Sequence, residues 1–239
     1  FFINPYGVRM IPRVSGNYYG KEMVANRVYK VVDLTGVRGI AMDGLGTLYV
    51  ATSTDGASNS NRGSLRILDR ATGTLTKITG WGSNAKADGS TLAAAGSLQF
   101  DSLSLDSNGN IFFGDIGTGK LWMIPAASGT YYGKAMIANQ LYSLAGHPTT
   151  GGYNGEDLLL TAAQASTRFY QNMAVSPEGH LLFADGTNWR VRMVPYTSGT
   201  YYGQAMTAHR VYTVAGTGGR SFSGEGAPSL QAQLRDPTR

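Results

Sequence analysis

The sequence contains no cysteine and no long apolar segment, and each absence narrows the kind of protein it can be. Without cysteine, the chain forms no disulfide and no metal site with thiolate ligands. No apolar segment approaches the roughly 20 residues that a membrane-spanning helix requires. We therefore expect no membrane insertion. No signal peptide is visible in the sequence either.

Charged residues are also few, at 15% of the chain, and lysine and arginine are scattered rather than grouped. The formal net charge of +5 allows attraction to anionic partners. However, no run of basic residues forms a stripe that could follow a nucleic-acid backbone. A nucleic-acid partner is therefore an alternative and not the first expectation.

Glycine and tyrosine, by contrast, are abundant, with 33 Gly and 14 Tyr among 239 residues. This composition is typical of a turn-rich β protein. A chain of this length can bury a sizeable core, and all-β architectures of this length commonly form one domain. We expect a single all-β domain over residues 1–239.

A phrase built on Tyr-Tyr-Gly occurs three times, at residues 15–29, 128–142 and 198–212. Each copy continues through a methionine into a strand-like run. The glycines of the three copies are Gly20, Gly133 and Gly203. This spacing indicates an array of similar units, with one shorter unit inside the longer gap.

Short runs of strand-forming residues between turn signals predict four units. The shorter unit has strands at 37–43, 47–51, 64–68 and 74–78. The expected division is a partial unit at 1–33, full units at 37–80, 100–146 and 170–216, and a connecting segment with the start of the next unit at 217–239. In a four-stranded meander the third-to-fourth connections all lie on one face. We expect the Tyr-Tyr-Gly phrases to crowd that rim.

A second repeated phrase joins the units, at residues 80–95, 145–165 and 215–234. Each copy has a glycine turn, an acidic residue and an alanine-rich stretch. The acids singled out are Asp88, Asp157 and Glu225. We expect them to cap single helical turns, because a carboxylate can accept the free N–H groups of a helix start. Calcium binding by these acids is the alternative.

Two stretches resemble the repeats of bacterial NHL-repeat β-propellers. Residues 183–192 read Phe-Ala-Asp-Gly-Thr-Asn-Trp-Arg-Val-Arg, and residues 214–237 run from Val-Ala-Gly through Phe-Ser-Gly-Glu-Gly-Ala to Asp-Pro. The resemblance covers essentially the whole chain. It implies an all-β β-propeller of four-stranded antiparallel blades around a central channel. Four blade-equivalents are visible, which we expect to be part of a six-bladed ring whose polypeptide extends past both ends of this sequence.

The paired tyrosines are candidate ligand-binding residues, since a tyrosine ring offers apolar area and a polar tip for a glycan or a protein partner. They are Tyr18, Tyr19, Tyr131, Tyr132, Tyr201 and Tyr202. The same rings could instead pack with Met23, Met136 and Met206 between neighbouring blades, and an element copied into successive blades favours that role. Asn188 and Arg190, in the NHL-like stretch, are two further candidates for a rim site.

Catalytic and metal-binding patterns are absent from the sequence. His147, His180 and His209 have no metal-ligand spacing, and there is no nucleophile elbow or phosphate-binding loop. We therefore expect no catalytic residue, no metal site and no cofactor, calcium excepted as above. Four aspartates precede turns, where aspartate bonds local backbone amides: Asp43, Asp106, Asp115 and Asp185.

The first functional hypothesis is a non-enzymatic binding or scaffolding propeller, secreted or at the cell surface of a bacterium, that binds a protein or glycan through its rim loops. One alternative is a propeller lyase or hydrolase with a metal at the channel mouth. A second alternative is an RNA-binding NHL propeller with a basic face built from Arg190, Arg192, Arg210 and Arg220.

Overall fold

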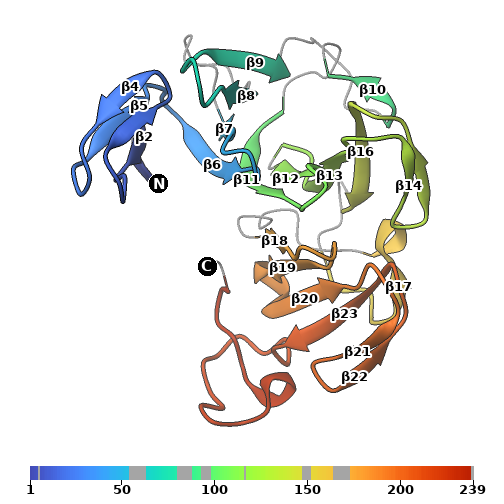
Figure 1. The fold of residues 1–239 in the computed structure, drawn as a ribbon. Helices are drawn as coiled ribbons and strands as arrows, with labels where there is room; N and C mark the ends of the chain where they lie inside the picture. Colours follow the sequence, from blue (N-terminus) through green and yellow to red (C-terminus); the bar gives the residue numbers. More distant parts are fainter. Residues whose placement is uncertain are drawn as a thin grey trace.

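The structure is a computed structural model that describes residues 1–4, 6–53, 63–79, 88–92, 98–115, 117–146, 152–163 and 173–237. In these residues the secondary structure is almost entirely antiparallel β, and helical structure is limited to three short 3-10 turns. Figure 1 shows four sheets following one another around an open arc, with β6, β11 and β18 on the concave side. The prediction of an all-β fold is confirmed.

We call the four sheets blades 1 to 4. Blade 2 is a meander of four strands in chain order: β6 (Val37–Met42), β7 (Leu48–Thr52), β8 (Ser64–Leu68) and β9 (Leu75–Thr79). Blade 3 repeats it with β11 (Phe100–Leu105), β12 (Ile111–Asp115), β13 (Lys120–Ile124) and β16 (Gln140–Ala145). Blade 4 has β18 (Met173–Val175), β19 (Leu181–Asp185), β20 (Arg190–Val194) and β23 (Arg210–Ala215). Turns that contain glycine close these meanders, which is why their strands are predictable from the sequence.

Blade 1 contains three described strands, β1 (Phe2–Asn4), β2 (Gly7–Met10) and β5 (Tyr29–Val32). They correspond to the second, third and fourth strands of the other blades, because β5 follows a Tyr-Tyr-Gly phrase as β16 and β23 do. The order of the strands from the concave to the convex side is therefore the same in every blade.

Each Tyr-Tyr-Gly phrase forms a small hairpin between the third and fourth strands, as predicted. The hairpins are β3 (Gly16–Tyr18) with β4 (Lys21–Met23), β14 (Gly129–Tyr131) with β15 (Lys134–Met136), and β21 (Gly199–Tyr201) with β22 (Gln204–Met206). In the first hairpin Tyr18 pairs with Lys21, and both turn residues have positive φ, 53° at Tyr19 and 71° at Gly20. Two positive φ values define a type I′ turn, which glycine adopts without strain.

Asp157 and Glu225 are not helix caps, so the prediction is wrong for these two acids, while most of the alanine-rich stretch after Asp88 lies outside the described residues. The 3-10 turns η1 (Leu160–Ala162) and η3 (Ser229–Gln231) have no side-chain capping hydrogen bond. Instead, short edge strands form just after the acids: β10 (Ser90–Thr91) pairs with β16, and β17 (Leu158–Leu159) pairs with β23. Asp88, two residues ahead of β10, accepts from Ser143 N of the fourth strand, while Asp157 stands directly before β17.

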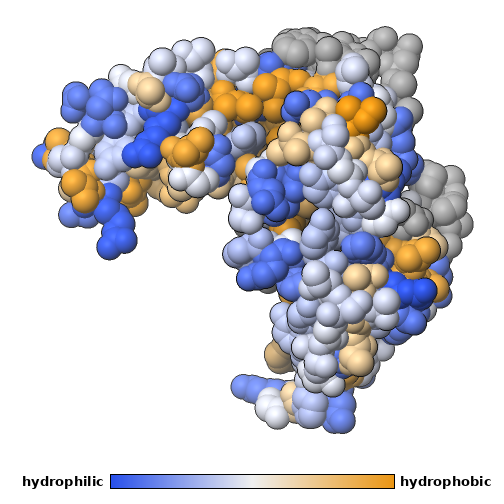
Figure 2. Space-filling view, turned by 45° about the vertical axis from the view of Figure 1, so that its right-hand side comes forward, coloured by the Kyte–Doolittle hydropathy of each residue, from blue (hydrophilic) through white to orange (hydrophobic). Residues whose placement is uncertain are grey.

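The hydrophobic core lies between the blades. One cluster joins blades 1 and 2, a second joins blades 2 and 3, and a third joins blades 3 and 4. Figure 2 shows the same open arc in space-filling form, with a deep hollow between its two ends. No helix in the described part of the chain is long and apolar enough to cross a membrane.

Candidate functional site

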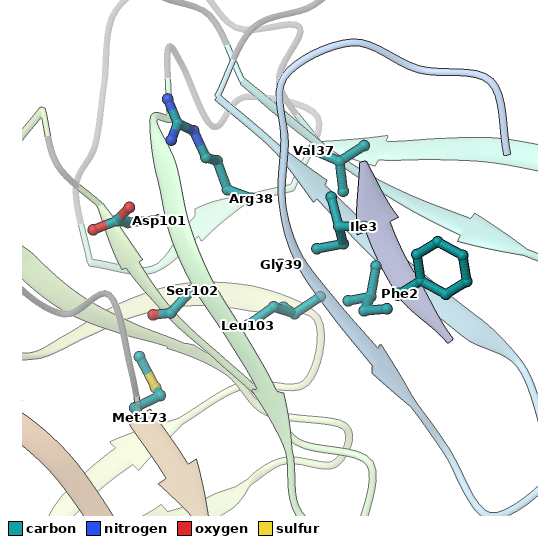
Figure 3. A pocket seen from close by; sticks show the side chains of 10 residues that line it. Phe2, Ile3, Val37, Arg38, Gly39, Asp101, Ser102, Leu103 and Met173 are labelled. Carbon is teal, nitrogen blue, oxygen red and sulfur yellow. The ribbon is translucent and has the colours of Figure 1, made fainter. Parts of the chain in front are cut away.

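A pocket of about 650 Å³ opens on the concave side of the arc, and residues of β1, β6, β11 and β18 line it. Ligand sites of proteins are commonly cavities of about 300–1,000 Å³ with a few polar groups on apolar walls. Figure 3 shows Arg38 and Asp101 on neighbouring strands at one side of this pocket, with Phe2, Ile3 and Val37 at the other.

Two β-bulges at matching positions direct the charged side chains of this pocket. Val37 pairs with Thr52 and Gly39 with Ala51, so Arg38 is an extra residue in β6 without a partner on β7. Phe100 pairs with Asp115 and Ser102 with Gly114, so Asp101 is the extra residue of β11. A bulge bends its strand and changes the direction of a side chain, which is why bulges are frequent at binding sites.

Asp101 is nearly buried, with 7% of its surface exposed, and its Oδ2 atom has no hydrogen-bond partner. Burial raises the pKa of this carboxyl, and the positive charge of Arg38 opposes that rise. Arg38 itself is exposed, and its Nε donates to Ser53 Oγ at 3.2 Å. The pocket therefore combines a buried acceptor atom without a partner and an exposed cation.

The other described walls of the pocket supply a hydroxyl and apolar area. Ser102 accepts a hydrogen bond from the Gly114 N–H at 3.2 Å through Oγ. The apolar lining comes from Phe2, Ile3, Val37, Ile40, Leu103 and Met173. Such a site can hydrogen-bond a small polar molecule and cover its less polar side. The described lining of the pocket contains no histidine. Its residues do not form the pair of a nucleophile and a general base that covalent catalysis requires.

The first tyrosine of each predicted pair closes its own loop. Tyr18, Tyr131 and Tyr201 donate through Oη to the carbonyl oxygens of Val14, Ala127 and Thr197, each four residues earlier, at 3.0, 2.9 and 3.0 Å. The identical bond in all three copies explains why this tyrosine recurs. These side chains stabilise the entry to the hairpin.

The second tyrosine of the first and third blades reaches the following blade. Tyr19 donates to Gly46 O at 2.9 Å and Tyr132 donates to Gly179 O at 2.8 Å, and both rings are buried, at 4% and 5% exposed. Burial raises the pKa of the Tyr132 hydroxyl, which keeps it a neutral donor. Tyr202, the same residue of blade 4, is 62% exposed.

The predicted packing between blades is confirmed for the phrases of blades 1 and 3, whereas Met206 of the third phrase packs only with residues of its own blade. Met23, Met136 and Met206 are all buried, at 1%, 3% and 3% exposed. Tyr19 and Met23 share a cluster with Leu48 of blade 2, while Tyr132 and Met136 share one with blade 4. Ligand binding by the six tyrosines stays a prediction.

Asn188 and Arg190 lie on the opposite rim, because the second-to-third connection leaves the other ends of the strands. Asn188 donates through Nδ2 to Asp185 Oδ1 at 2.8 Å. Arg190 donates to Asn188 O at 2.9 Å and to Thr217 O at 3.0 Å, and its guanidinium carbon lies 3.9 Å from the centre of the Tyr153 ring. Asn188 and Arg190 therefore organise one rim, while the paired tyrosines organise the other, and the two predicted groups do not form a single site.

The histidines have local roles where the structure describes them. His180 Nδ1 accepts from the Tyr196 N–H at 3.0 Å, and the His209 ring lies beside Tyr132 with 6.0 Å between ring centroids. His147 lies outside the described residues. Among the described residues, no group of three His, Asp or Glu side chains could hold a metal ion.

The three acids considered for calcium have different surroundings. Asp88 accepts from Lys134 Nζ and from Ser143 N, and Asp157 Oδ2 lies 3.6 Å from Arg210 Nη1. Glu225 is exposed. By contrast, Asp43, Asp106 and Asp115 accept hydrogen bonds from nearby backbone N–H groups, so the turn role predicted for these three is confirmed.

Sequence reasoning missed Arg38 and Asp101. No motif marks them, and the only available signal was their matching place: each stands two residues before an apolar residue, Ile40 or Leu103, that pairs with the middle of the second strand. Neither charge would be noticed without the register of both blades.

Radially packed antiparallel blades around a concave pocket define this protein as a β-propeller. No protein-family model matches the chain, and no curated protein sequence matches it. Among solved structures, it is similar to a protein of unknown function from Bacteroides thetaiotaomicron, with 16% identity, a TM-score of 0.59, and coverage of 88% of this chain and 44% of that chain.

Two auxiliary nutrient binding proteins are also similar in structure. The one from Bacteroides thetaiotaomicron has 14% identity and a TM-score of 0.50 over 90% of this chain and 43% of its own. The one from Bacteroides ovatus has 15% identity and a TM-score of 0.50 over 89% of this chain and 44% of its own. The chain thus spans less than half the length of these structures, and at such identities the likeness shows the fold alone.

Proposed function

We propose that this protein is a non-enzymatic binding β-propeller of the NHL-repeat kind that holds a glycan in the concave pocket. The observation that carries the proposal is the Asp101 carboxylate, which a β-bulge directs to the pocket beside Arg38 and which has an Oδ2 atom without a partner. Leaving a buried polar group unsatisfied costs about 1–3 kcal/mol. A ligand hydroxyl that donates to Asp101 would remove that cost.

The chemistry of the pocket favours a sugar over other small molecules. A sugar ring offers many hydroxyl donors and acceptors, and Asp101, Arg38 and Ser102 provide an acceptor, a donor and a hydroxyl. The apolar side of a sugar ring would lie against Ile3 or Met173. The structural similarity to two auxiliary nutrient binding proteins agrees with this choice and with a secreted or cell-surface location, which is part of the proposal.

Rim loops belong to the same proposal as a second contact surface for a longer glycan or a protein partner. Tyr153 is 39% exposed and lies under the Arg190 guanidinium, so the rim presents an aromatic ring and a cation together. Cation–π pairs and tyrosine rings are both common in recognition surfaces.

Glycan binding should depend on the two bulge residues. Asp101→Asn and Arg38→Gln should each weaken the affinity for the best glycan of a soluble panel by about tenfold or more, because a hydrogen bond to a charged group contributes about 1.5–3 kcal/mol. Isothermal titration calorimetry checks this. The controls are Asp33→Asn and Arg13→Gln, which change exposed residues of blade 1.

Equal affinities in all four variants would place the binding site elsewhere. If no glycan of the panel binds the wild-type protein, the proposal fails. Release of shortened glycan during the titration would instead support the hydrolase alternative, and the metal content of the purified protein would then be measured.

Asp101 should also cost stability at neutral pH. Because burial raises its pKa in the folded state, the ionised carboxyl disfavours that state, and this loss develops as the pH rises from below about 3.9, the unfolded value, through the raised folded value. Asp101→Asn should therefore raise the melting temperature at pH 7 and leave it unchanged at pH 3. Asp33→Asn is the control, since the Lys30 hydrogen bond lowers the pKa of Asp33 and its removal should bring no gain. Calorimetric scans at both pH values test this, and a gain at pH 3 that equals the gain at pH 7 would contradict it.

A further inference from the structure

The junction between blades 2 and 3 differs from its two neighbours on the rim that carries the Tyr-Tyr-Gly hairpins. Blades 1 and 3 each extend a hairpin toward the following blade, whereas the third and fourth strands of blade 2 are joined by a tight turn at residues 69–74 (Figure 1). In that turn, which the structure describes completely, Gly73 N donates to Asp69 O at 2.9 Å. Blade 2 therefore contributes no tyrosine hairpin to its junction with blade 3.

At the other two junctions, the second tyrosine of the hairpin bonds the next blade in the same way. Tyr19 donates to Gly46 O at 2.9 Å, and Tyr132 donates to Gly179 O at 2.8 Å. Both glycines belong to the turn between the first and second strands of the blade that follows. A glycine carbonyl at this turn is therefore an acceptor for a tyrosine hydroxyl.

Each of these two tyrosine rings also lies edge-on to an aromatic ring of its own blade. The ring centroids are 6.0 Å apart for Phe1 and Tyr19, and 6.1 Å apart for Phe112 and Tyr132. The strand registers give Phe1 and Phe112 the same place in their blades. Edge-to-face pairs of this kind are favourable beyond the apolar area that they bury. The tyrosine thus joins an aromatic ring of one blade to a glycine carbonyl of the next.

The junction between blades 2 and 3 has both of these groups without a tyrosine between them. The registers of β7, β8 and β9 put Tyr49 in the place that Phe112 has in blade 3. Gly109 closes the turn between the first and second strands of blade 3, with a positive φ of 80°. No described residue donates a hydrogen bond to Gly109 O.

Side chains around this place are also more exposed than those of the next junction. Phe112 and Met123 are both 0% exposed, in the cluster that includes the hairpin of blade 3. Tyr49 and Ile67, which have the same register places in blade 2, are only half-buried. Thr76, which pairs with Ile67, is exposed. The outer face of blade 2 is therefore incompletely covered near this rim.

The side chain beside Gly109 leaves the place open as well. A methyl group on Gly109 would lie 3.8 Å from Ala126 Cβ, and Ala126 is exposed. The same position in blade 4 is Tyr196, whose ring centroid lies 5.5 Å from that of Tyr132. An alanine is too short to replace a tyrosine ring. We call the following set of residues the Gly109 surface: Tyr49, Ile67, Thr76, Gly109 and Ala126.

We infer that the Gly109 surface is a docking surface for a tyrosine-bearing β-hairpin of a partner protein. The partner's tyrosine hydroxyl would donate to Gly109 O, and its ring would lie edge-on to Tyr49, as at the two occupied junctions. An apolar side chain four residues after that tyrosine would cover Ile67, because Met136 follows Tyr132 by four residues and is buried in the same cluster. Continuity with the two occupied junctions is the reason for this assignment.

The backbone of the partner follows from the same comparison. Tyr132 and Gly133 have positive φ, 49° and 79°, and such a pair forms the type I′ turn of a two-residue hairpin. A partner hairpin with Tyr-Gly at its turn is preorganised to present the ring in this way, which lowers the ordering cost of binding. The Gly109 surface shares no residue with the concave pocket, so docking and glycan binding can fail independently.

A cyclised peptide of residues 127–138 is the probe, because it contains the complete hairpin with Tyr132 and Met136. It should bind the protein with a Kd below about 1 mM in a fluorescence anisotropy titration. The Tyr132→Phe peptide should bind about three- to tenfold more weakly, because it has no hydroxyl donor for Gly109 O. The Tyr132→Ala peptide, which lacks the aromatic anchor, should show no detectable binding.

A pair of protein variants tests the location of the docking surface. Ala126→Trp should prevent binding of the peptide, because the indole would cover Gly109. Ala135→Trp is the matched control: Ala135 is also exposed, but it lies on β15, in the hairpin that reaches blade 4. Thermal melts followed by circular dichroism should show that both variants fold.

Amide chemical shifts locate the peptide without any variant. The N–H signals of Ile67, Gly109 and Ala126 should shift when the peptide is added, while that of Arg190 on the opposite rim should not. Shifts confined to the concave pocket would overturn the inference. So would the absence of binding at about 1 mM peptide, equal affinities of the unchanged and Tyr132→Phe peptides, or equal losses in the two tryptophan variants.

Two further results would assign the surface to another occupant and would also overturn the inference. If p-cresol shifted the same amides at the same concentration as the peptide, the occupant would be a small aromatic alcohol. If the protein alone formed a dimer with these amides shifted, the occupant would be a second copy of the chain.

Discussion

Replacing Tyr132 with alanine should lower the free energy of unfolding by about 3–5 kcal/mol, the usual cost of removing a buried aromatic side chain. The ring is 5% exposed and lies in the cluster between blades 3 and 4, within 5.5 Å of the Tyr196 ring centroid. The cavity would open between two blades, where the hairpin and the neighbouring turn are held by their own strands. The site therefore has little freedom to collapse, which keeps the cost high.

The chain provides its own control, because Tyr202 has the same place in the last hairpin but is 62% exposed. Tyr202→Ala should change stability by less than about 0.5 kcal/mol, as surface substitutions usually do. Tyr132→Phe separates the two contributions. It keeps the ring but leaves Gly179 O without its 2.8 Å donor, at a cost of about 1–3 kcal/mol.

Urea unfolding followed by tryptophan fluorescence measures all three variants. The expected order of stability loss is Tyr132→Ala, then Tyr132→Phe, then Tyr202→Ala. If Tyr132→Ala and Tyr202→Ala had equal effects, the buried position of Tyr132 between the blades would be incorrect. If stability were unchanged and binding of a partner were lost, the tyrosine would be a recognition residue, as the aromatic-platform hypothesis states.

The repeats made most of the architecture predictable from the sequence. Local signals determine where each strand lies, since Gly46, Gly109 and Gly179 close turns with positive φ just before β7, β12 and β19. The position of the Tyr-Tyr-Gly hairpins could also be deduced, since the order of strands in a meander assigns each connection to one rim. The hydrogen-bond partners of Tyr19 and Tyr132 could not be deduced from the sequence, because Gly46 and Gly179 belong to the next blade.

Features that depend on register between strands were not predictable. Asp88 looked like a helix cap because it precedes an alanine-rich stretch, yet its partner Ser143 lies 55 residues away. In the second copy the matching acid is Glu156 and not Asp157, and only the contact to Thr213 reveals this. The two bulges are likewise invisible in the sequence, since Arg38 and Asp101 become unpaired only through the pairing of their neighbours.

The other large effect concerns Arg192, a fully buried cation in blade 4 with 1% of its surface exposed. Its Nη1 lies 3.6 Å from Asp185 Oδ2 and its Nη2 lies 3.6 Å from Glu156 Oε2, and Nη2 also donates to Gly155 O at 3.0 Å. Burial lowers the pKa of Arg192, and the two carboxylates oppose that change. The cation is thus held by charges from the second strand of its own blade and from the preceding phrase.

Arg192→Met should lower the free energy of unfolding by about 3–5 kcal/mol, because it leaves the buried Asp185 without its cation. The loss would not come from placing an apolar side chain at this position, since Trp122 occupies the same register position in blade 3 and is fully buried. Arg210→Met is the matched control: Arg210 lies 3.6 Å from Asp157, but both side chains are partly exposed, so about 0–1 kcal/mol is expected.

A double variant identifies the cause of the loss. If uncompensated charge is responsible, adding Asp185→Asn to Arg192→Met should restore part of the stability, and a double-mutant cycle in urea would give a favourable coupling between the two residues. Additive losses would mean that Arg192 acts through packing and its bond to Gly155 alone. An Arg192→Met variant as stable as Arg210→Met would show that the phrase before blade 4 is not held by this cation.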